Sequence, residues 1–308
     1  MRRTCAGALV AVFIVSLVTR AASAALYGVG PFAAGPSNLY RIDDASGVAT
    51  VIGSTGVTSL GGLAGAADGT LYAYTASSLY TLNPATGGAS FVGPLGLSAP
   101  EGGLSVQPAT GTLFGVRSVQ GADALLTINT ATGAATIVGA LGDAGRDTSG
   151  LAFRPGDGAL FGAAFRGGLA DDLVRIDTAT GAASTIGPLG TNVAGLDDPT
   201  VGGLEFDALS GVLYYSDGDR LYTVNPQTGA AAVLGAHGVS NVAGLAFVVP
   251  EPTATATLAV AGIAIVAIRR RRRESTTRCS PVTRASCPCW RCTHGRDAHV
   301  TGEFLNRV

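Results

Sequence analysis

The sequence predicts an all-β fold: a five-bladed β-propeller of four-stranded antiparallel blades, closed by both termini of the repeat region. An N-terminal signal peptide and one C-terminal transmembrane helix are expected to flank it. Three observations favour the propeller. A Gly-Leu motif recurs five times, with its leucines 41, 47, 53 and 41 residues apart. Glycine supplies 45 of 308 residues, about twice the usual share of roughly 7%. The first and last copies of the repeat are incomplete in complementary ways.

The first 24 residues resemble a secretory signal in their layout. Two arginines follow the initial methionine, and residues 5–18 form an apolar stretch that is too short to span a bilayer. Small residues then lead up to Ala24. This pattern predicts a signal peptide over residues 1–24, cleaved between Ala24 and Ala25. A buried N-terminal helix is the alternative.

Residues 25–249 form the repeat region, and each complete unit predicts four short strands. A Gly-Leu strand comes first, and a Gly-x-Leu-aromatic strand follows about nine residues later. The third strand ends in Asp or Asn and enters a turn that closes with glycine, where φ is positive. A fourth strand completes the unit. The Gly-Leu copies are Gly62-Leu63, Gly103-Leu104, Gly150-Leu151, Gly203-Leu204 and Gly244-Leu245.

The two ends of the repeat region complement each other. The first unit starts at Leu26 and lacks its Gly-Leu strand, whereas the last copy, residues 243–248, consists of that strand alone. Placing the last strand beside the first would complete one blade and leave no exposed edge in the ring. The count then closes at five blades. A linear β-solenoid is the structural alternative.

The recurring Leu-Tyr-x-Ile-Asx strands and Thr-Gly turns, as in Leu39 to Asp43 and Thr180-Gly181, resemble those of bacterial surface propellers. The resemblance covers Leu26 to Val248. It implies an architecture and no particular activity, because propellers host enzymes, lectins and scaffolds alike.

After the repeats comes a three-part segment over residues 250–273. Pro250-Glu251-Pro252 is followed by sixteen uncharged residues, Thr253–Ile268, and then by five consecutive arginines. As a helix, the sixteen residues would be about 24 Å long, which suits a short membrane span. The arginine run predicts a cytoplasmic end, which leaves the propeller on the other side of the membrane.

This segment resembles the PEP-CTERM sorting domain of Gram-negative bacteria. The resemblance implies processing by an exosortase-type membrane protease and a link to exopolysaccharide or biofilm. The chain would be anchored transiently in the inner membrane with a periplasmic propeller, and would then reach the cell surface or the extracellular space. An ordinary C-terminal anchor is the alternative. The residues that carry the resemblance are Pro250, Glu251, Pro252, Arg269, Arg270, Arg271, Arg272 and Arg273.

The tail, residues 274–308, departs from the family pattern, because family members usually end soon after the arginines. It holds four of the five cysteines and two of the three histidines. A zinc site is the alternative here, but paired Cys-x₂-Cys knuckles are missing. We expect a disordered Cys-rich tail without function.

Composition limits the partners and the chemistry of the repeat region. Residues 26–252 contain seven arginines and eighteen acidic residues, a net charge of −11. Such a surface repels phosphate backbones, so nucleic acid is not an expected partner. There is no cysteine between Ala6 and Arg278, which excludes a disulfide framework and a cysteine nucleophile from this region.

The candidate site residues are positions where one repeat departs from the others. Glu205 stands where other Gly-Leu strands have Ala or Ser, and Asp207 follows two residues later, on the same face if the strand continues. Asp197 and Asp198 lie in a connection that exceeds the repeat length. These four carboxylates could hold a ligand or a calcium ion, although solvated side chains are the simpler interpretation. No resident cofactor and no metal are expected.

No catalytic residues are predicted. His237 is the single histidine of the repeats, and no Gly-x-Ser-x-Gly motif accompanies it. We therefore expect a noncatalytic binding or structural module that contacts polysaccharide or surface proteins. The alternative is an extracellular carbohydrate-active hydrolase or lyase that uses Glu205 and Asp207. A third possibility is extracellular bulk without a defined ligand.

Overall fold

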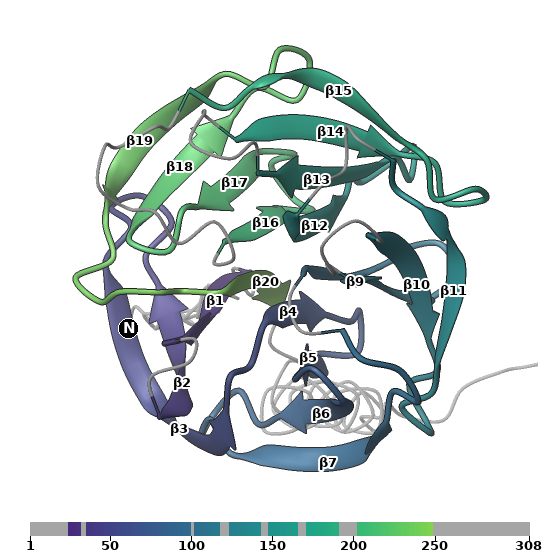
Figure 1. Cartoon of the computed structure of the whole chain (residues 1–308). Coiled ribbons are helices and arrows are strands. Elements are labelled where there is room, and N and C mark those ends of the chain that lie inside the picture. The colour runs from purple at the N-terminus through teal and green to yellow at the C-terminus, as the bar shows by residue number, and fades with distance from the viewer. Residues whose placement is uncertain are drawn as a thin grey trace, which may run out of the picture. The chain divides into compact units, whose positions relative to one another are not determined.

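A computed structural model describes residues 24–31, 35–99, 102–117, 123–142, 147–165, 171–190 and 202–248. Five antiparallel sheets of four strands each surround a common axis (Figure 1). The predicted all-β, five-bladed propeller is thus confirmed. The chain divides into two compact units, Met1–Thr253 and Ala254–Val308. The predicted signal peptide up to residue 23, the sorting segment and the tail lie outside the described residues.

The four strands of each blade follow one another from the axis outward. Blade 1 consists of β20 (Gly244–Val248), β1 (Ala25–Gly30), β2 (Pro36–Ile42) and β3 (Ala49–Thr58); blade 2 of β4 (Gly62–Gly65), β5 (Leu71–Tyr74), β6 (Ser78–Leu82) and β7 (Ala89–Pro94). Blade 3 consists of β8 (Leu104–Val106), β9 (Leu113–Arg117), β10 (Ala124–Ile128) and β11 (Ala135–Ala140). Blade 4 consists of β12 (Thr148–Phe153), β13 (Leu160–Ala164), β14 (Asp172–Ile176) and β15 (Ala183–Pro188); blade 5 of β16 (Gly203–Phe206), β17 (Leu213–Ser216), β18 (Arg220–Val224) and β19 (Ala231–Ala236). Among the described residues no helix is long and apolar enough to cross a membrane.

The ring closes through blade 1, which combines both ends of the repeat region. β20 pairs antiparallel with β1, so that Ala25 faces Val248 and Val29 faces Gly244. Figure 1 shows the last strand lying beside the first. The predicted closure by both termini is therefore confirmed.

The hydrophobic core lies between neighbouring blades. Most residues of the inner three strands of each blade are buried, whereas the outermost strands are partly exposed along their length. Aromatic rings join adjacent blades: Phe161 of blade 4 contacts Phe206 of blade 5, with ring centroids 5.5 Å apart. Tyr214 of blade 5 and Phe247 of blade 1 have the same centroid separation, 5.5 Å. Such pairs stabilise the seams beyond their area of burial.

Glycine of the Gly-Leu motif sets how closely the five innermost strands approach. A Cβ atom on Gly203 would lie 2.6 Å from the backbone nitrogen of Leu245 in the next blade. The same close approach recurs at every seam, so only glycine permits this spacing of the strands. The motif is visible in the sequence, but this reason for it is not. The remaining contacts run from Gly62 to Leu104, from Gly103 to Leu151, from Gly150 to Leu204 and from Gly244 to Leu63.

A second set of glycines joins the blades at their outer strands. Gly181 closes the turn of blade 4 with a φ of +82°, and its missing Cβ would lie 2.5 Å from the carbonyl oxygen of Gly139 in blade 3. Gly139 in turn stands against the carbonyl of Thr180. The Thr-Gly turn of one blade thus packs on the outer strand of the preceding blade. This contact explains why glycine recurs in this turn in every unit.

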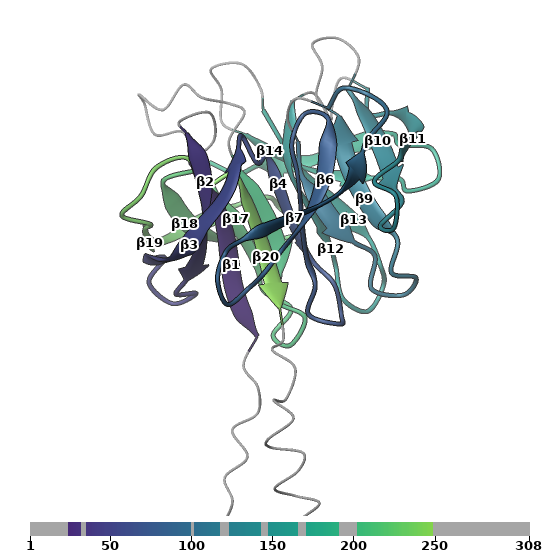
Figure 2. The same cartoon turned by 90° about the horizontal axis from the view of Figure 1, so that it is seen from below.

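The two ends of the propeller differ. β1 begins and β20 ends at the end of the ring that also carries the Asx-Thr-Gly turns, which we call the terminal face. β9 and β13 end at the opposite end of the ring, which we call the loop face (Figure 2), and the strands that meet there are separated by unequal numbers of residues. Anything that extends from Ala25 and Val248 therefore leaves from the terminal face.

Candidate functional site

Glu205 lies on β16, the innermost strand of blade 5, and is half-buried. The equivalent positions carry Ala64, Ser105, Ala152 and Ala246, all buried. Burial raises the pKa of Glu205 well above its ordinary value, and a hydrogen bond from the Phe206 backbone opposes this only in part. Its cross-strand partner is Tyr214. Burial therefore favours the protonated form of this carboxyl group.

Asp207, the second predicted carboxylate, belongs to a turn at the terminal face. Its Oδ1 accepts a hydrogen bond from the Leu209 backbone at 3.0 Å. Its Oδ2 accepts from the Ser210 backbone at 3.3 Å and from the Ser210 hydroxyl at 2.6 Å. Both carboxylate oxygens are therefore engaged by the turn itself. The structure gives Asp207 the capping role that Asp and Asn have in the other turns.

The remaining predicted site residues belong to segments whose structure is not described. These are Asp197, Asp198, the Pro250-Glu251-Pro252 motif and Arg269–Arg273. Within the described ranges, no group of three His, Cys, Asp or Glu side chains is arranged to hold a metal ion.

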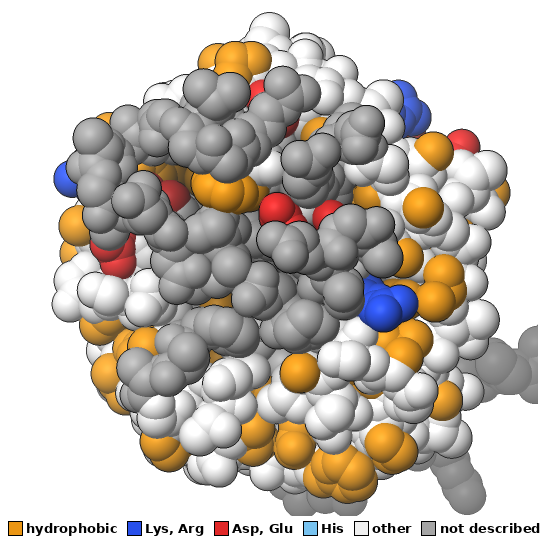
Figure 3. All heavy atoms as spheres, in the orientation of Figure 1, with side chains coloured by type: hydrophobic (Ala, Val, Ile, Leu, Met, Phe, Trp, Pro, Cys, Tyr) orange, Lys and Arg blue, Asp and Glu red, His pale blue; other side chains and the backbone are white. Residues whose placement is uncertain are grey.

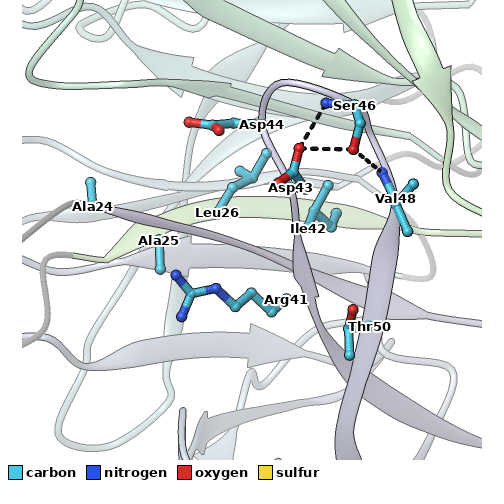
Figure 4. A pocket seen from close by; sticks show the side chains of 10 residues that line it. All are labelled: Ala24, Ala25, Leu26, Arg41, Ile42, Asp43, Asp44, Ser46, Val48 and Thr50. Carbon is cyan, nitrogen blue, oxygen red and sulfur yellow. Dashed lines mark hydrogen bonds between the residues drawn. The ribbon is translucent and has the colours of Figure 1, made fainter.

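Ala24 and Ala25, the predicted cleavage junction, border a shallow hollow of about 390 Å³ on blade 1 (Figure 4). Arg41 extends along it towards Ala25, and Asp44 lies at its far side. Asp43 accepts hydrogen bonds from the backbone and the hydroxyl of Ser46, both at 2.8 Å, which lower its pKa. The hollow is polar and open, and it carries both signs of charge.

Acidic side chains also gather at the loop face, where Figure 3 shows several of them in red. Asp171 accepts a hydrogen bond from the hydroxyl of Tyr215, which joins blade 4 to blade 5. Burial raises the pKa of Asp171, and nearby Asp217 raises it further. Asp217 accepts from the Tyr222 hydroxyl at 2.6 Å. The Asp171–Tyr215 hydrogen bond therefore links blades 4 and 5, whereas Asp217 and Tyr222 both belong to blade 5.

Ser216 and His237 form a buried polar pair at the seam between blades 5 and 1. The Ser216 hydroxyl lies 2.9 Å from Nε2 of His237, and Nδ1 lies 2.8 Å from the carbonyl oxygen of Gly47. Both side chains are 0% exposed. A substrate could not reach the serine, and a backbone carbonyl takes the place that a carboxylate has in a Ser-His-Asp triad. Sequence reasoning missed the pair, although an alignment of the repeats would have exposed both residues.

Comparison with known proteins gives no family. No protein-family model matches the chain, and no curated protein matches it. Among solved structures it is similar to TolB from Acinetobacter baumannii, with 14% identity and a TM-score of 0.43 over 73% of this chain and 54% of that one. It thus spans about half the length of TolB.

Two further solved structures give a similar result. One is a protein of unknown function from Bacteroides thetaiotaomicron, with 16% identity and a TM-score of 0.43 over 68% of this chain and 64% of that one. The other is a gluconolactonase from Xanthomonas campestris, with 13% identity and a TM-score of 0.44 over 71% of this chain and 78% of that one. At these identities the likeness concerns the fold and says nothing about activity.

Proposed function

We propose that this chain is an exported, membrane-sorted surface or extracellular-matrix protein whose propeller is a noncatalytic binding or structural module. The observation that carries the proposal is the pairing of Ala25 with Val248. Ala25 and Val248 lie at the terminal face, so the predicted signal peptide and the predicted sorting segment would both extend from that face. The whole loop face is thereby left free for a partner, such as exopolysaccharide or another surface protein.

Chain length sets the distance between the propeller and the membrane in this proposal. The predicted helix begins at Thr253, five residues after Val248. Five residues reach at most about 18 Å, so the terminal face would stay close to the bilayer. The loop face would then point away from it, towards whatever surrounds the cell.

The chemistry of the described residues supports binding over catalysis. The carboxylate of Asp207 is used by its turn, and the Ser216–His237 pair is buried without access for a substrate. Loops of uneven length on a rigid scaffold are, by contrast, a common way to build a binding surface. The acidic loop face would favour neutral or cationic partners.

The experiment is a glycan panel. Full-length chain, purified in a mild nonionic detergent, is passed over immobilised bacterial polysaccharides while the eluate is assayed for released sugars. The proposal expects retention on at least one polysaccharide and no product. Absence of retention on every polysaccharide would overturn the carbohydrate partner, and released sugar would overturn the noncatalytic role.

The second candidate is a carbohydrate-active hydrolase or lyase, and the environment of Glu205 favours it. Burial raises the pKa of Glu205, and a carboxyl group with a raised pKa is suited to act as a general acid. In this candidate Glu205 protonates the leaving oxygen, and Asp207 would have to give up its hydrogen bonds to Leu209 and Ser210 to act as the second carboxylate. Product release that disappears in Glu205→Gln and persists in Asp44→Asn would establish it.

A further inference from the structure

At the seam between blades 5 and 1, two positions of the repeat carry polar residues where the other blades carry mostly apolar ones. Ser216, at the end of β17, replaces a residue that is apolar or aromatic in the other blades. His237, just beyond β19, replaces leucine in three blades and threonine in the fourth. The register of the strands makes these positions equivalent, and all ten residues are buried. The equivalents of Ser216 are Val29, Tyr74, Val116 and Ala163, and those of His237 are Thr55, Leu95, Leu141 and Leu189.

The backbone at this position makes the same contact at several seams. The Leu95, Leu141 and Leu189 carbonyls each accept a hydrogen bond from the first residue of the next outer strand. The His237 carbonyl likewise accepts from Ala49 of blade 1 at 3.0 Å. What differs is the side chain. Leucine adds only apolar contact, whereas the imidazole adds hydrogen bonds to both blades.

The hydrogen bonds fix the tautomer of His237. The Gly47 carbonyl can only accept, so Nδ1 carries the proton and donates to it. Nε2 is then unprotonated and accepts from the Ser216 hydroxyl. That hydroxyl also accepts from the Gly218 backbone at 3.1 Å. In this neutral form every polar atom of the pair is satisfied.

Protonation at Nε2 would break this arrangement. The imidazolium would donate from both nitrogens, so the Ser216 proton would lose its acceptor while a charge is created in a fully buried place. A buried charge and a buried unpaired donor each carry a substantial cost. The cost falls on the seam between blades 5 and 1, where β20 is the strand that closes the ring.

We propose that the Ser216–His237 pair is an acid-sensitive latch, and that protonation of His237 loosens blade 1 from blade 5 and opens the ring at this seam. The proposal does not depend on the proposed function. The acidic groups around the imidazole are Asp217 and Asp219 in the β17–β18 connection of blade 5, and the backbone of Arg220, the first residue of β18, also favours the imidazolium. Asp43 and Asp44 stand on the blade 1 turn that carries Gly47.

The direction of the pH dependence follows from burial. Burial lowers the pKa of His237, and the Gly47 carbonyl together with Asp217 and Asp219 offsets this only in part. The unfolded chain, with a histidine pKa of about 6.5, therefore binds the proton more readily than the folded chain. The contribution of His237 to folding stability is therefore fully present above pH of about 6.5. It is lost as the pH falls from there towards the pKa of His237 in the folded chain. Each unit of lowering corresponds to a tenfold change in the unfolding equilibrium constant.

The experiment compares the wild-type chain with a variant that carries the residues of blade 3 at both positions. Full-length chain and the double variant Ser216→Val with His237→Leu are unfolded with urea at pH 7.5 and pH 5.0 in the same detergent. We expect the wild-type unfolding constant to rise more than that of the variant on acidification, because only the wild type carries the buried histidine. Equal changes in the two proteins would overturn the latch.

A second variant and a local measurement guard against a misfolded double variant. His237→Gln keeps one donor and one acceptor but does not titrate in this range, so it should lose the acid sensitivity. Hydrogen exchange, corrected for the intrinsic rate, should rise on acidification in β1 and β20 of the wild type before it rises in blade 3. Uniform exchange across all blades, or an acid sensitivity that persists in His237→Gln, would contradict the proposal.

Discussion

Ala25, the first residue of β1, is the cross-strand partner of Val248, the last residue of β20. One hydrogen-bonded pair of strands thus joins the two ends of the repeat region. We expect folding of the whole ring to depend on β20, because without it blade 1 would expose the inner edge of β1 at the seam. The dependence is open to a direct test by truncation.

A chain that ends at Ala243 should not fold, whereas a chain that ends at Thr253 should fold like the full-length protein. The shorter form lacks the buried Leu245, Ala246 and Val248. Circular dichroism and limited proteolysis would separate the two forms. Equal protease resistance would show that the ring closes without its last strand.

Gly203→Ala should destabilise the protein by about 1–3 kcal/mol, the usual cost of overpacking. The added Cβ would lie 2.6 Å from the backbone nitrogen of Leu245, and backbone cannot move aside. The matched control is Gly88→Ala, whose Cβ would have its nearest neighbour at 3.6 Å. Urea unfolding measures both, and similar free energies of unfolding would refute the role assigned to the inner glycines.

Glu205→Ala should stabilise the protein at pH 7 and have little effect near pH 4. The folded pKa of Glu205 is raised by burial, so the folded chain holds this proton more tightly than the unfolded chain. Stability is therefore lost as the pH rises above the glutamate pKa of the unfolded chain, about 4.3. Thermal unfolding at both pH values tests this, and an alanine variant that is less stable at pH 7 would count against it.

Asp177→Ala should weaken the blade 4 turn, whereas Asp177→Asn should preserve it. The Asp177 carboxylate accepts hydrogen bonds from the Ala179 and Thr180 backbones at 2.8 and 2.9 Å, and these bonds lower its pKa. The contribution of these hydrogen bonds to stability is present above pH of about 4. It is lost as the pH falls towards the pKa of Asp177 in the folded chain. Acid unfolding followed by fluorescence should show a smaller pH dependence in the asparagine variant, which matches Asn129 of blade 3.

The repeat pattern was sufficient to predict the fold, because each unit specifies its own strands and turns. Asx and glycine positions fix the hairpins locally, and the complementary ends leave one way to close the ring. The seam contacts could not be predicted in the same way. The fit of Gly203 against Leu245, and of Gly181 against Gly139, depends on backbone approach between blades.

The candidate site was less predictable for a related reason. Asp207 was expected beside Glu205 on a continuing strand, but β16 ends at Phe206 and Asp207 belongs to the turn. His237 was considered as a catalytic residue without a partner, because Ser216 is brought to it only by the pairing of β17, β18 and β19. A partner that is distant in sequence leaves no local pattern.

The central claim is that the propeller is exported and sorted through a removable membrane segment. Intact-mass spectrometry of the chain recovered from the surface fraction of the producing bacterium tests it most directly. The account predicts a protein that begins at Ala25 and lacks the arginine run, Arg269–Arg273, together with everything that follows it. A chain recovered intact from Met1 to Val308 in the inner membrane would contradict it.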